Sequence, residues 1–406
     1  MTTPPGTPGP LTGVRVLDLS QVVSGPICGR MLADLGAEVV KVEPMEGDII
    51  RRLQPQFGDD SMSVYFSWVN AGKRSIAVDL RDARVAAMVR RLAVTSDVVL
   101  ENFRPGVMEK FGMGTEELRA GNPRLIFCSI SGWGAGNSWS QRRAYAAMVQ
   151  AEAGRVELDA RLRGAPAEQS THVDGDIQPG LLAVSAVCAA LYQRERDGVG
   201  QHVDVAMAEA LLYTDEWAST ELTRYDGPRV PDTWRYPVFT VADGTMVAFM
   251  GDPHQRLPEI AAAISDEPIG YTESRDEAVA TLARLFATMP DFPTVEARMD
   301  TFGFLVAQVR SIPDVAETPW AIEREVFAEV EPGVRVTAAP FRSSTGGVRV
   351  QGPAPRLGQD TLAVLRGTGA TDEELAVLAE AGLLGTAEGH VAAVQARIER
   401  PRKPAR

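Results

Sequence analysis

An aspartate at the beginning of a predicted helix is the side chain in this sequence best placed to do chemistry. Asp176 stands in the polar stretch 172–180, directly before an apolar pattern with helical spacing at Leu181, Leu182, Val184, Val187, Cys188 and Leu191. Unpaired backbone N–H groups and the positive end of the helix dipole favour an ionised carboxylate there, and an ionised carboxylate can act as a nucleophile. Aspartate is also a preferred N-cap residue for structural reasons alone, so the position by itself leaves both interpretations open.

Other familiar chemistries find little support in the residue types. Cys28, Cys128 and Cys188 are odd in number, far apart and set among apolar residues, which is typical of reduced core thiols rather than of disulfides or a metal site. The four histidines, at positions 172, 202, 254 and 390, lack ligand spacing, so no metal is expected. The turn 24–29 lacks the G-x-G-x-x-G pattern that binds NAD, and the sequence has no phosphate-binding loop for ATP.

Length and charge restrict the class of protein. At 406 residues, the chain is expected to form two domains, or one large domain with a satellite. A net charge of −13 argues against nucleic acid and anionic membranes as partners, and no apolar stretch is expected to reach membrane-spanning length. The first ten residues lack the basic start and apolar segment of a signal peptide, which predicts a cytoplasmic protein.

The elements that must position Asp176 follow a strand, helix, strand order. Residues 14–19 and 38–43 are predicted strands, separated by a turn at 20–26 and a helix at 27–35, and this βαβ unit requires parallel strands. The alternation continues with strands at 75–80, 97–101 and 124–130 and helices at 83–93, 115–120 and 206–212. We therefore expect an α/β fold with an open, mostly parallel, Rossmann-like sheet over residues 1–224.

A second, smaller α+β domain is predicted for residues 225–335. The polar, proline-containing stretch 225–236 is interpreted as a linker, and residues 238–242 and 246–250 flank Asp243-Gly244 as the two strands of a hairpin. Residues 336–406 are expected to form a linker and C-terminal helices that return to the large domain. One of these helices is predicted to begin at a capping box, Thr371 with Glu374, and to run through Ala381.

Several strings in register resemble one known family, the family III CoA-transferases, also called the CaiB/BaiF family. They are LTGVRVLDL at 11–19, SGP at 24–26, ADLGAEVVKVE at 33–43, KRSIAVDL at 73–80, VLENFRPGV at 99–107, NPRLI at 122–126 and GVGQHVDVA at 198–206, with a weaker match, PRLG, at 355–358. The resemblance implies an interlocked homodimer with coenzyme A lying across the N-terminal α/β domain. It also implies an enzyme that moves CoA from an acyl-CoA thioester to a carboxylic acid through a covalent aspartyl intermediate.

The family's nucleophile lies in a D-x-x-x-G pattern before an apolar helix. Asp176 with Gly180 matches this pattern. Asp174 is the nearby competitor, although the position four residues after it is Gln178 rather than glycine.

The resemblance implies further contacts with CoA, residue by residue. The matching positions are Val22, Val23 and Ser24 in the loop that packs on CoA, Val78 and Arg81 at the nucleotide, Asn102 and Phe103 in the adenine and pantetheine wall, Lys110 at a phosphate, and Arg143 and Tyr145 beside the acyl group. These residue types suit CoA, because Arg and Lys pair with phosphates and Phe covers an adenine face.

Departures from the family pattern bear on the reaction. Val23 stands where formyl-CoA transferases have a glutamine, which disfavours oxalate and formate chemistry, and Ala146 stands where relatives often have an acid. One alternative is an α-methylacyl-CoA racemase, whose histidine base is matched here by Tyr145, and a phenol is a poor base at neutral pH. A second alternative is a CoA-binding protein without turnover, to which Ala146 alone points.

Overall fold

The computed structural model describes residues 7–58, 62–223 and 236–389. The chain forms two compact units, one of residues 1–218 together with 325–406 and one of residues 219–324. The second unit thus starts before residue 225 and ends before residue 335, the bounds predicted from the sequence. Of the predicted linker 225–236, all but the last residue lies outside the described residues.

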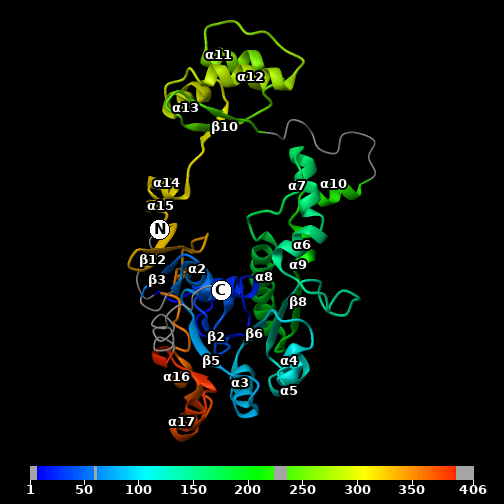
Figure 1. The fold of residues 1–406 in the computed structure, drawn as a ribbon, viewed down its shortest axis with the longest axis vertical. Helices are drawn as coiled ribbons and strands as arrows, with labels where there is room; N and C mark the ends of the chain where they lie inside the picture. The colour runs from blue at the N-terminus through cyan, green and yellow to red at the C-terminus, as the bar shows by residue number, and fades with distance from the viewer. Residues whose placement is uncertain (1–6, 59–61, 224–235, 390–406) are drawn as a thin grey trace, which may run out of the picture. The chain divides into compact units, whose positions relative to one another are not determined.

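A seven-stranded sheet organises the first unit (Figure 1). Its strands are β1 (Arg15–Asp18), β2 (Glu38–Glu43), β5 (Arg74–Val78), β6 (Val98–Glu101), β7 (Ile126–Ser131), β8 (His202–Ala206) and β14 (Leu384–Gly385). They lie in the order β14-β5-β2-β1-β6-β7-β8, and every pairing is parallel except the antiparallel pair of β14 with β5. The predicted α/β fold with a mostly parallel sheet is confirmed.

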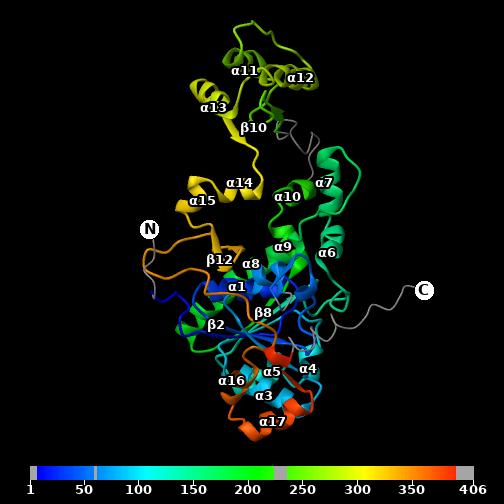
Figure 2. The same ribbon diagram turned by 60° about the vertical axis from the view of Figure 1, so that its left-hand side comes forward.

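Side chains alternate between the two faces of this sheet, and each face carries its own core. Leu17 and Leu19 face a cluster formed with α3 (Ala83–Thr95), α5 (Thr115–Gly121), α16 (Thr361–Arg366) and α17 (Asp372–Glu380). Val16 faces the opposite cluster, formed with α1 (Ser24–Asp34), α8 (Asp174–Asp197) and α9 (Met207–Tyr213). Figure 2 shows the C-terminal helices α16 and α17 beside α3, so the end of the chain completes the core of the N-terminal sheet.

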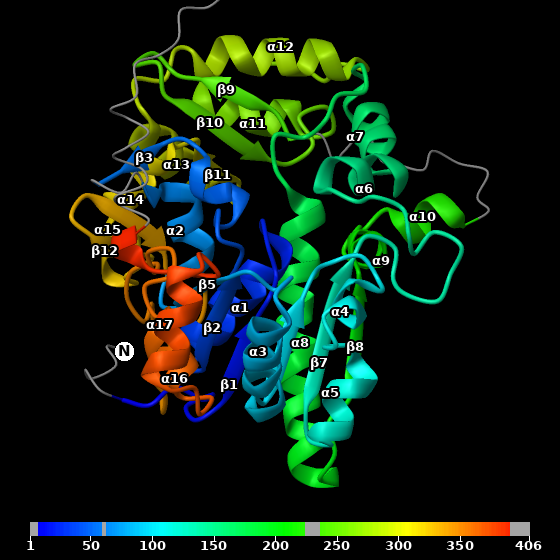
Figure 3. The same ribbon diagram turned by 60° about the horizontal axis from the view of Figure 1, so that its bottom comes forward.

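Helix α8 is long and apolar enough to cross a membrane by length and composition alone, because its 24 residues contain an 18-residue window with a mean hydropathy of 1.2. This corrects the expectation that no stretch reaches that length. The core helix of a soluble protein passes the same test, and α8 packs along α1, β7 and β8 (Figure 3). The residue periodicity could not reveal its length, because Pro179 lies inside the helix after its first turn.

Helix α1 begins at Ser24, three residues before the predicted start, so the predicted turn 20–26 is shorter than expected. Pro26 is tolerated because it lies in the first helical turn, where its missing N–H would have no partner within the helix. The capping box of Thr371 and Glu374 at the start of α17 is confirmed.

The remaining elements of the first unit are short. They are η1 (Ile49–Arg52), β3 (Gln56–Phe57), β4 (Met62–Ser63), α2 (Val64–Asn70), α4 (Val107–Lys110), α6 (Ala146–Glu152), α7 (Arg155–Arg163), β12 (Phe327–Glu331) and β13 (Val334–Thr337). Helix α10 (Ala218–Leu222) spans the boundary between the units.

The second unit has a three-stranded antiparallel sheet with helices. The predicted hairpin is confirmed as β9 (Val238–Thr240) paired with β10 (Met246–Met250), and β11 (Leu305–Gln308) adds a third strand. The helices are α11 (Leu257–Ile264), α12 (Arg275–Phe286), α13 (Phe292–Thr301), α14 (Ile312–Ala316) and α15 (Pro319–Glu323). Stacked rings of Phe239 and Phe286, with centroids 4.5 Å apart, lie in its core.

Candidate active site

The carboxyl ends of β1 and β6 define the place where a ligand is expected. The chain runs from β1 outward to β2 and β5 on one side and then returns to place β6 on the other side of β1. In an open parallel sheet this reversal leaves a crevice between the two loops that follow the strands. The loops in question are residues 19–23 after β1 and residues 102–105 after β6.

Asn102 joins these two loops. The backbone N–H of Gln21 donates to Asn102 Oδ1 at 2.8 Å, and Asn102 Nδ2 donates to the Gln21 carbonyl at 2.7 Å and to Ser24 Oγ at 3.1 Å. The amide of Asn102 therefore holds the loop before α1, in addition to lining the crevice beside it.

The D-x-x-x-G spacing has a steric reason in the packing of α8 on α1. A Cβ at Gly180 would lie 2.3 Å from Ile27 Cγ2 and 2.4 Å from the Ser24 carbonyl oxygen, so only glycine allows this close approach. Asp176 lies one helical turn before Gly180 on the same side of α8. The glycine thereby brings the carboxylate to the loop that precedes α1.

A second glycine brings the segment before α6 to the same point. A Cβ at Gly175 would lie 2.9 Å from the Ala146 carbonyl oxygen, so the start of α6 lies directly against the start of α8. Residues 143–145, which precede α6, are therefore held next to Asp176.

A cavity of about 370 Å³ lies among these segments. Its lining contains seven of the eleven residues predicted from the sequence, namely Val22, Ser24, Asn102, Phe103, Arg143, Tyr145 and Asp176. It also contains residues that the sequence did not single out, among them Gln21, Ser131 and Met207. We call it the Asp176 cavity.

A neighbouring cavity of about 290 Å³ shares Gln21 and Phe103 with the Asp176 cavity. Val78 and Arg81, both predicted at the nucleotide, lie in its lining, together with the apolar side chains of Leu19, Val42, Met45 and Phe111. Arg81 is largely exposed and pairs with Asp79 at 2.7 Å. We call it the apolar cavity.

Two predicted residues lie outside both linings. The side chain of Val23 is buried in a core cluster with Ile50, Met62 and Phe66, although its neighbours Val22 and Ser24 line the Asp176 cavity. Lys110 is exposed at the end of α4. Their contacts with CoA stay predictions.

Asp176 does not cap its helix. Helix α8 begins at Asp174 with Val173 in the N-cap position, and no side chain makes a capping hydrogen bond there. Within the described part of the chain, the Asp176 carboxylate has neither an ion pair nor a hydrogen-bonding side chain. The capping interpretation is therefore wrong, and the carboxylate is left available for another use.

Burial raises the pKa of the Asp176 carboxyl to about 6. This is opposite in direction to the effect of a helix N-terminus that we expected, because the carboxyl loses hydration on burial. With a pKa of about 6 the group is still mostly ionised at pH 7, but its negative charge is poorly solvated. Tyr65 of α2, which the sequence did not single out, lies close enough that burial and the Asp176 charge together raise its pKa.

Three arginines also line the Asp176 cavity. Arg142 forms an ion pair with Glu152 and lies over the Trp139 ring, 4.1 Å from its centroid. Arg104 and Arg143 also line the cavity, and among the described residues neither guanidinium has a carboxylate partner. The cavity thus combines one reactive anion with cationic groups that could hold an anionic ligand.

Comparisons with known proteins agree on one family. The model of CoA-transferase family III matches residues 11–361. The succinate–glutarate CoA-transferase of Agrobacterium fabrum is 32% identical over 392 residues, which cover 90% of this chain and 97% of that protein. The succinyl-CoA:mesaconate CoA-transferase of Haloarcula hispanica is 32% identical over 377 residues, covering 86% and 94%. The crystal structure of a CaiB/BaiF family protein from Brucella suis has a TM-score of 0.76 at 27% identity and covers 89% of this chain and 100% of that chain.

Proposed function

This chain belongs to CoA-transferase family III, and from that premise we propose that it transfers CoA from an acyl-CoA thioester to a carboxylic acid with the Asp176 carboxylate as its nucleophile. The main support for this proposal is the environment of the Asp176 carboxylate. It is buried, has no polar partner among the described side chains and lies in a cavity that adjoins a second, apolar one.

CoA fits this pair of cavities by its chemistry. In the proposal the adenine occupies the apolar cavity, where Phe111 and Val78 offer apolar contact and Arg81 lies beside the phosphates. The neutral pantetheine arm passes Gln21 and Phe103, which belong to both linings, and the thioester then reaches Asp176.

The proposed reaction exchanges acyl groups on Asp176. A carboxylate oxygen of Asp176 attacks the thioester carbonyl and the carbon–sulfur bond breaks. CoA leaves as a thiolate, and Asp176 and the donor acyl group remain joined as a mixed anhydride. The thiolate then attacks the aspartyl carbonyl, which releases the donor acid and forms an aspartyl-CoA thioester. The acceptor carboxylate attacks this thioester and expels the thiolate, which finally takes the acceptor acyl group and frees Asp176.

Burial of Asp176 serves this sequence in two ways. A poorly solvated carboxylate is a stronger nucleophile than a hydrated one, and exclusion of water protects the anhydride from hydrolysis. The racemase alternative requires a second base, and the described residues that line the Asp176 cavity include Tyr145 but no histidine. The site therefore favours transfer.

We further propose that the preferred acyl groups carry a second carboxylate. Arg104 and Arg143 line the Asp176 cavity, and in this proposal the pantetheine arm there is neutral and provides no charge to pair with them. A dicarboxylic acyl group provides that charge at its free end. The relatives named for succinate, glutarate and mesaconate, which are dicarboxylic acids, support this choice.

We also propose that the protein is a homodimer, interlocked as the resemblance implies. The apolar window of α8 is only 39% buried within one chain, and Leu181 and Tyr192 of α8 are exposed together with Leu212 and Tyr213 of α9. A second copy would cover this apolar surface.

Sedimentation velocity should give one species of twice 43.7 kDa that persists on dilution, whereas a monomer would contradict the proposal.

Replacing Asp176 tests the nucleophile, and Asp174 provides a matched control in the same turn of α8. Asp176→Ala should lower the rate of CoA transfer by at least about 10³-fold, because the covalent route is lost. Asp174→Ala should retain transfer within about tenfold, because Asp174 is not in the cavity lining. The measurement is formation of the acceptor acyl-CoA by mass spectrometry. Full activity of Asp176→Ala, or an equal loss in both variants, would refute the assignment.

A panel of donors and acceptors tests the substrate class. Succinyl-CoA and glutarate should be used with kcat/KM at least about tenfold above butyryl-CoA and butyrate, which have similar length but no second carboxylate. Arg143→Gln should reduce the dicarboxylic values by about ten- to hundredfold, as expected for loss of a charged hydrogen bond, and leave the monocarboxylic values nearly unchanged. Equal use of both classes by the unaltered enzyme would exclude the second carboxylate as a determinant.

A further inference from the structure

We propose that Asp48, paired with Lys41, is a positioning residue for the Asp176 cavity, because it holds Val22 in a left-handed backbone conformation that valine disfavours. The kinetic part of this inference rests on the proposed CoA transfer. Its structural part rests on contacts within the first unit.

Val22 is the strained point of the loop between β1 and α1. Its φ is +67°, and among the described non-glycine residues only Glu325 shares a positive φ. A β-branched side chain in this region is a true outlier, since its Cβ crowds the backbone. Such a conformation persists only where the surroundings impose it, and residues of this kind gather at functional sites. Val22 lies in the lining of the Asp176 cavity.

Asp48 supplies the contact that imposes this conformation. The backbone N–H of Val22 points at the Asp48 carboxylate, with distances of 3.1 Å to Oδ2 and 3.3 Å to Oδ1. The same carboxylate accepts from the N–H of Ile50 at 3.2 Å, so Asp48 is itself fixed as the N-cap of η1. These contacts hold the Val22 N–H in the orientation that accompanies its positive φ.

Lys41 contacts both Asp48 and the start of the loop. Its Nζ lies 3.1 Å from Asp48 Oδ2 and donates to the carbonyl of Ser20 at 2.7 Å, and both side chains of the pair are fully buried. Burial alone would lower the pKa of Lys41, but the nearby Asp48, Asp18 and Glu43 outweigh burial and raise it. The lysine therefore stays charged, and a buried charged pair allows little movement.

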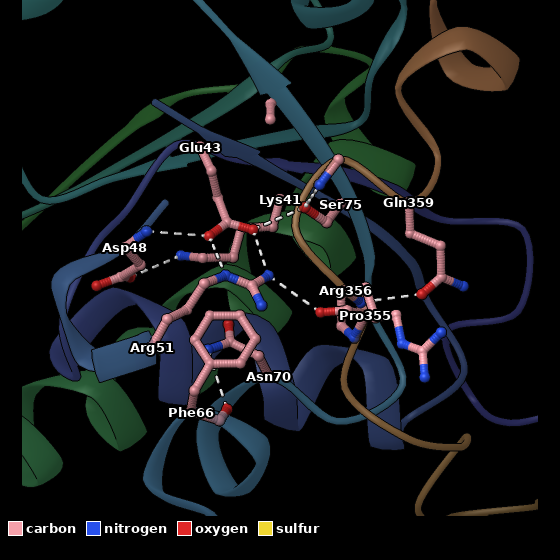
Figure 4. Close-up of polar contacts among 12 residues, drawn as sticks. Lys41, Glu43, Asp48, Arg51, Phe66, Asn70, Ser75, Pro355, Arg356 and Gln359 are labelled. Atoms are coloured by element: carbon pink, nitrogen blue, oxygen red, sulfur yellow. Dashed lines mark hydrogen bonds and ion pairs between the residues drawn. The ribbon is translucent and has the colours of Figure 1, made fainter. Parts of the chain in front are cut away.

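A further buried pair lies behind Asp48, as Figure 4 shows. Glu43 receives two hydrogen bonds from Arg51 at 2.7 Å, one from Ser75 Oγ at 2.7 Å and one from the backbone N–H of Asp48 at 3.1 Å. Arg51 donates in turn to the carbonyl of Pro355 at 3.0 Å. The support of the Val22 loop thus extends from β2 to the C-terminal segment that returns to the sheet.

Removal of Asp48 would break a buried ion pair and destabilise the fold, but Lys41 would keep other partners. Lys41 would keep the Ser20 carbonyl as an acceptor, and Asp18 and Glu43 would still balance its charge. The lost constraint falls on Val22, whose N–H would have no anchor. The backbone at Val22 would then relax toward negative φ, and Val22 and Ser24, which line the cavity, would move away from Asp176.

The test places Asp48→Ala in two backgrounds, Val22→Ala and Val22→Gly. Both backgrounds delete the valine side chain, but only glycine adopts a positive φ without strain. Asp48→Ala should lower kcat/KM for CoA transfer about tenfold more in the alanine background than in the glycine background, because the glycine loop still populates the original conformation. Asp48→Ala should lower the melting temperature less in the alanine background, because relaxation there releases strain.

A larger loss of kcat/KM together with a smaller fall in melting temperature in the alanine background distinguishes positioning from a merely structural role. Equal losses of kcat/KM in the two backgrounds would overturn the inference, and so would a melting temperature that falls more in the alanine background. If Asp48→Ala does not fold, Asp48→Asn, which keeps one acceptor oxygen, replaces it with the same signs and smaller changes expected. If the unaltered enzyme transfers no CoA, the proposed function fails, while the melting temperatures still decide whether Asp48 holds the strained loop.

Discussion

Buried charges must be paired, and this requirement fixes the carboxyl edge of the sheet. Asp18, Glu43 and Asp48 are fully buried or nearly so, and each meets a cation, Lys73 at 2.8 Å, Arg51 at 2.7 Å and Lys41 at 3.1 Å. An unpaired charge at such depth would cost several kcal/mol, so these contacts tolerate little displacement. Lys73 also donates to the carbonyl of Pro26 at 2.8 Å, which ties the first turn of α1 to β1. The loop after β1, residues 19–23, is anchored to these buried ion pairs through Lys41 and Asp48.

Asp176 differs from these three paired carboxylates. It is buried as they are, but no cation among the described residues compensates its charge, and burial raises its pKa to about 6. Burial would also raise the pKa of Glu43, but the neighbouring Arg51 outweighs this effect, and the pKa of Glu43 falls to about 2. A carboxylate destabilised in this way gains more from forming an acyl bond than a paired one would. Glu101 is also buried without a cation, and its pKa rises to about 7, but it accepts a hydrogen bond from the backbone N–H of Phe103 at 2.8 Å. Among the described residues, Asp176 has no such partner, so its carboxylate is left for chemistry.

Much of this arrangement could be predicted from the sequence, because it depends on local patterns. Short apolar runs located the central strands, Asp243-Gly244 located the hairpin, and the family resemblance is confirmed by the match over residues 11–361. Asp176 and Gly180 were found by their spacing. The contact of Asp48 with Val22 and the effect of the Asp176 charge on Tyr65 were not foreseen, since each joins segments whose proximity only the tertiary fold decides. Nor could the sequence show that Val23 turns into the core while Val22 and Ser24 face the cavity, because the backbone conformation of this loop, with its positive φ at Val22, decides which side chains point inward.

The central claim is that Asp176 carries the acyl group or CoA during turnover, and trapping that adduct tests it most directly. The enzyme is mixed with succinyl-CoA in the absence of acceptor, quenched with hydroxylamine and digested, and the peptide that contains residues 174–180 is analysed by mass spectrometry. The account predicts an aspartyl hydroxamate at Asp176, formed only when the thioester is present. Turnover without any label on this peptide, or a label on Asp174 instead, would contradict it.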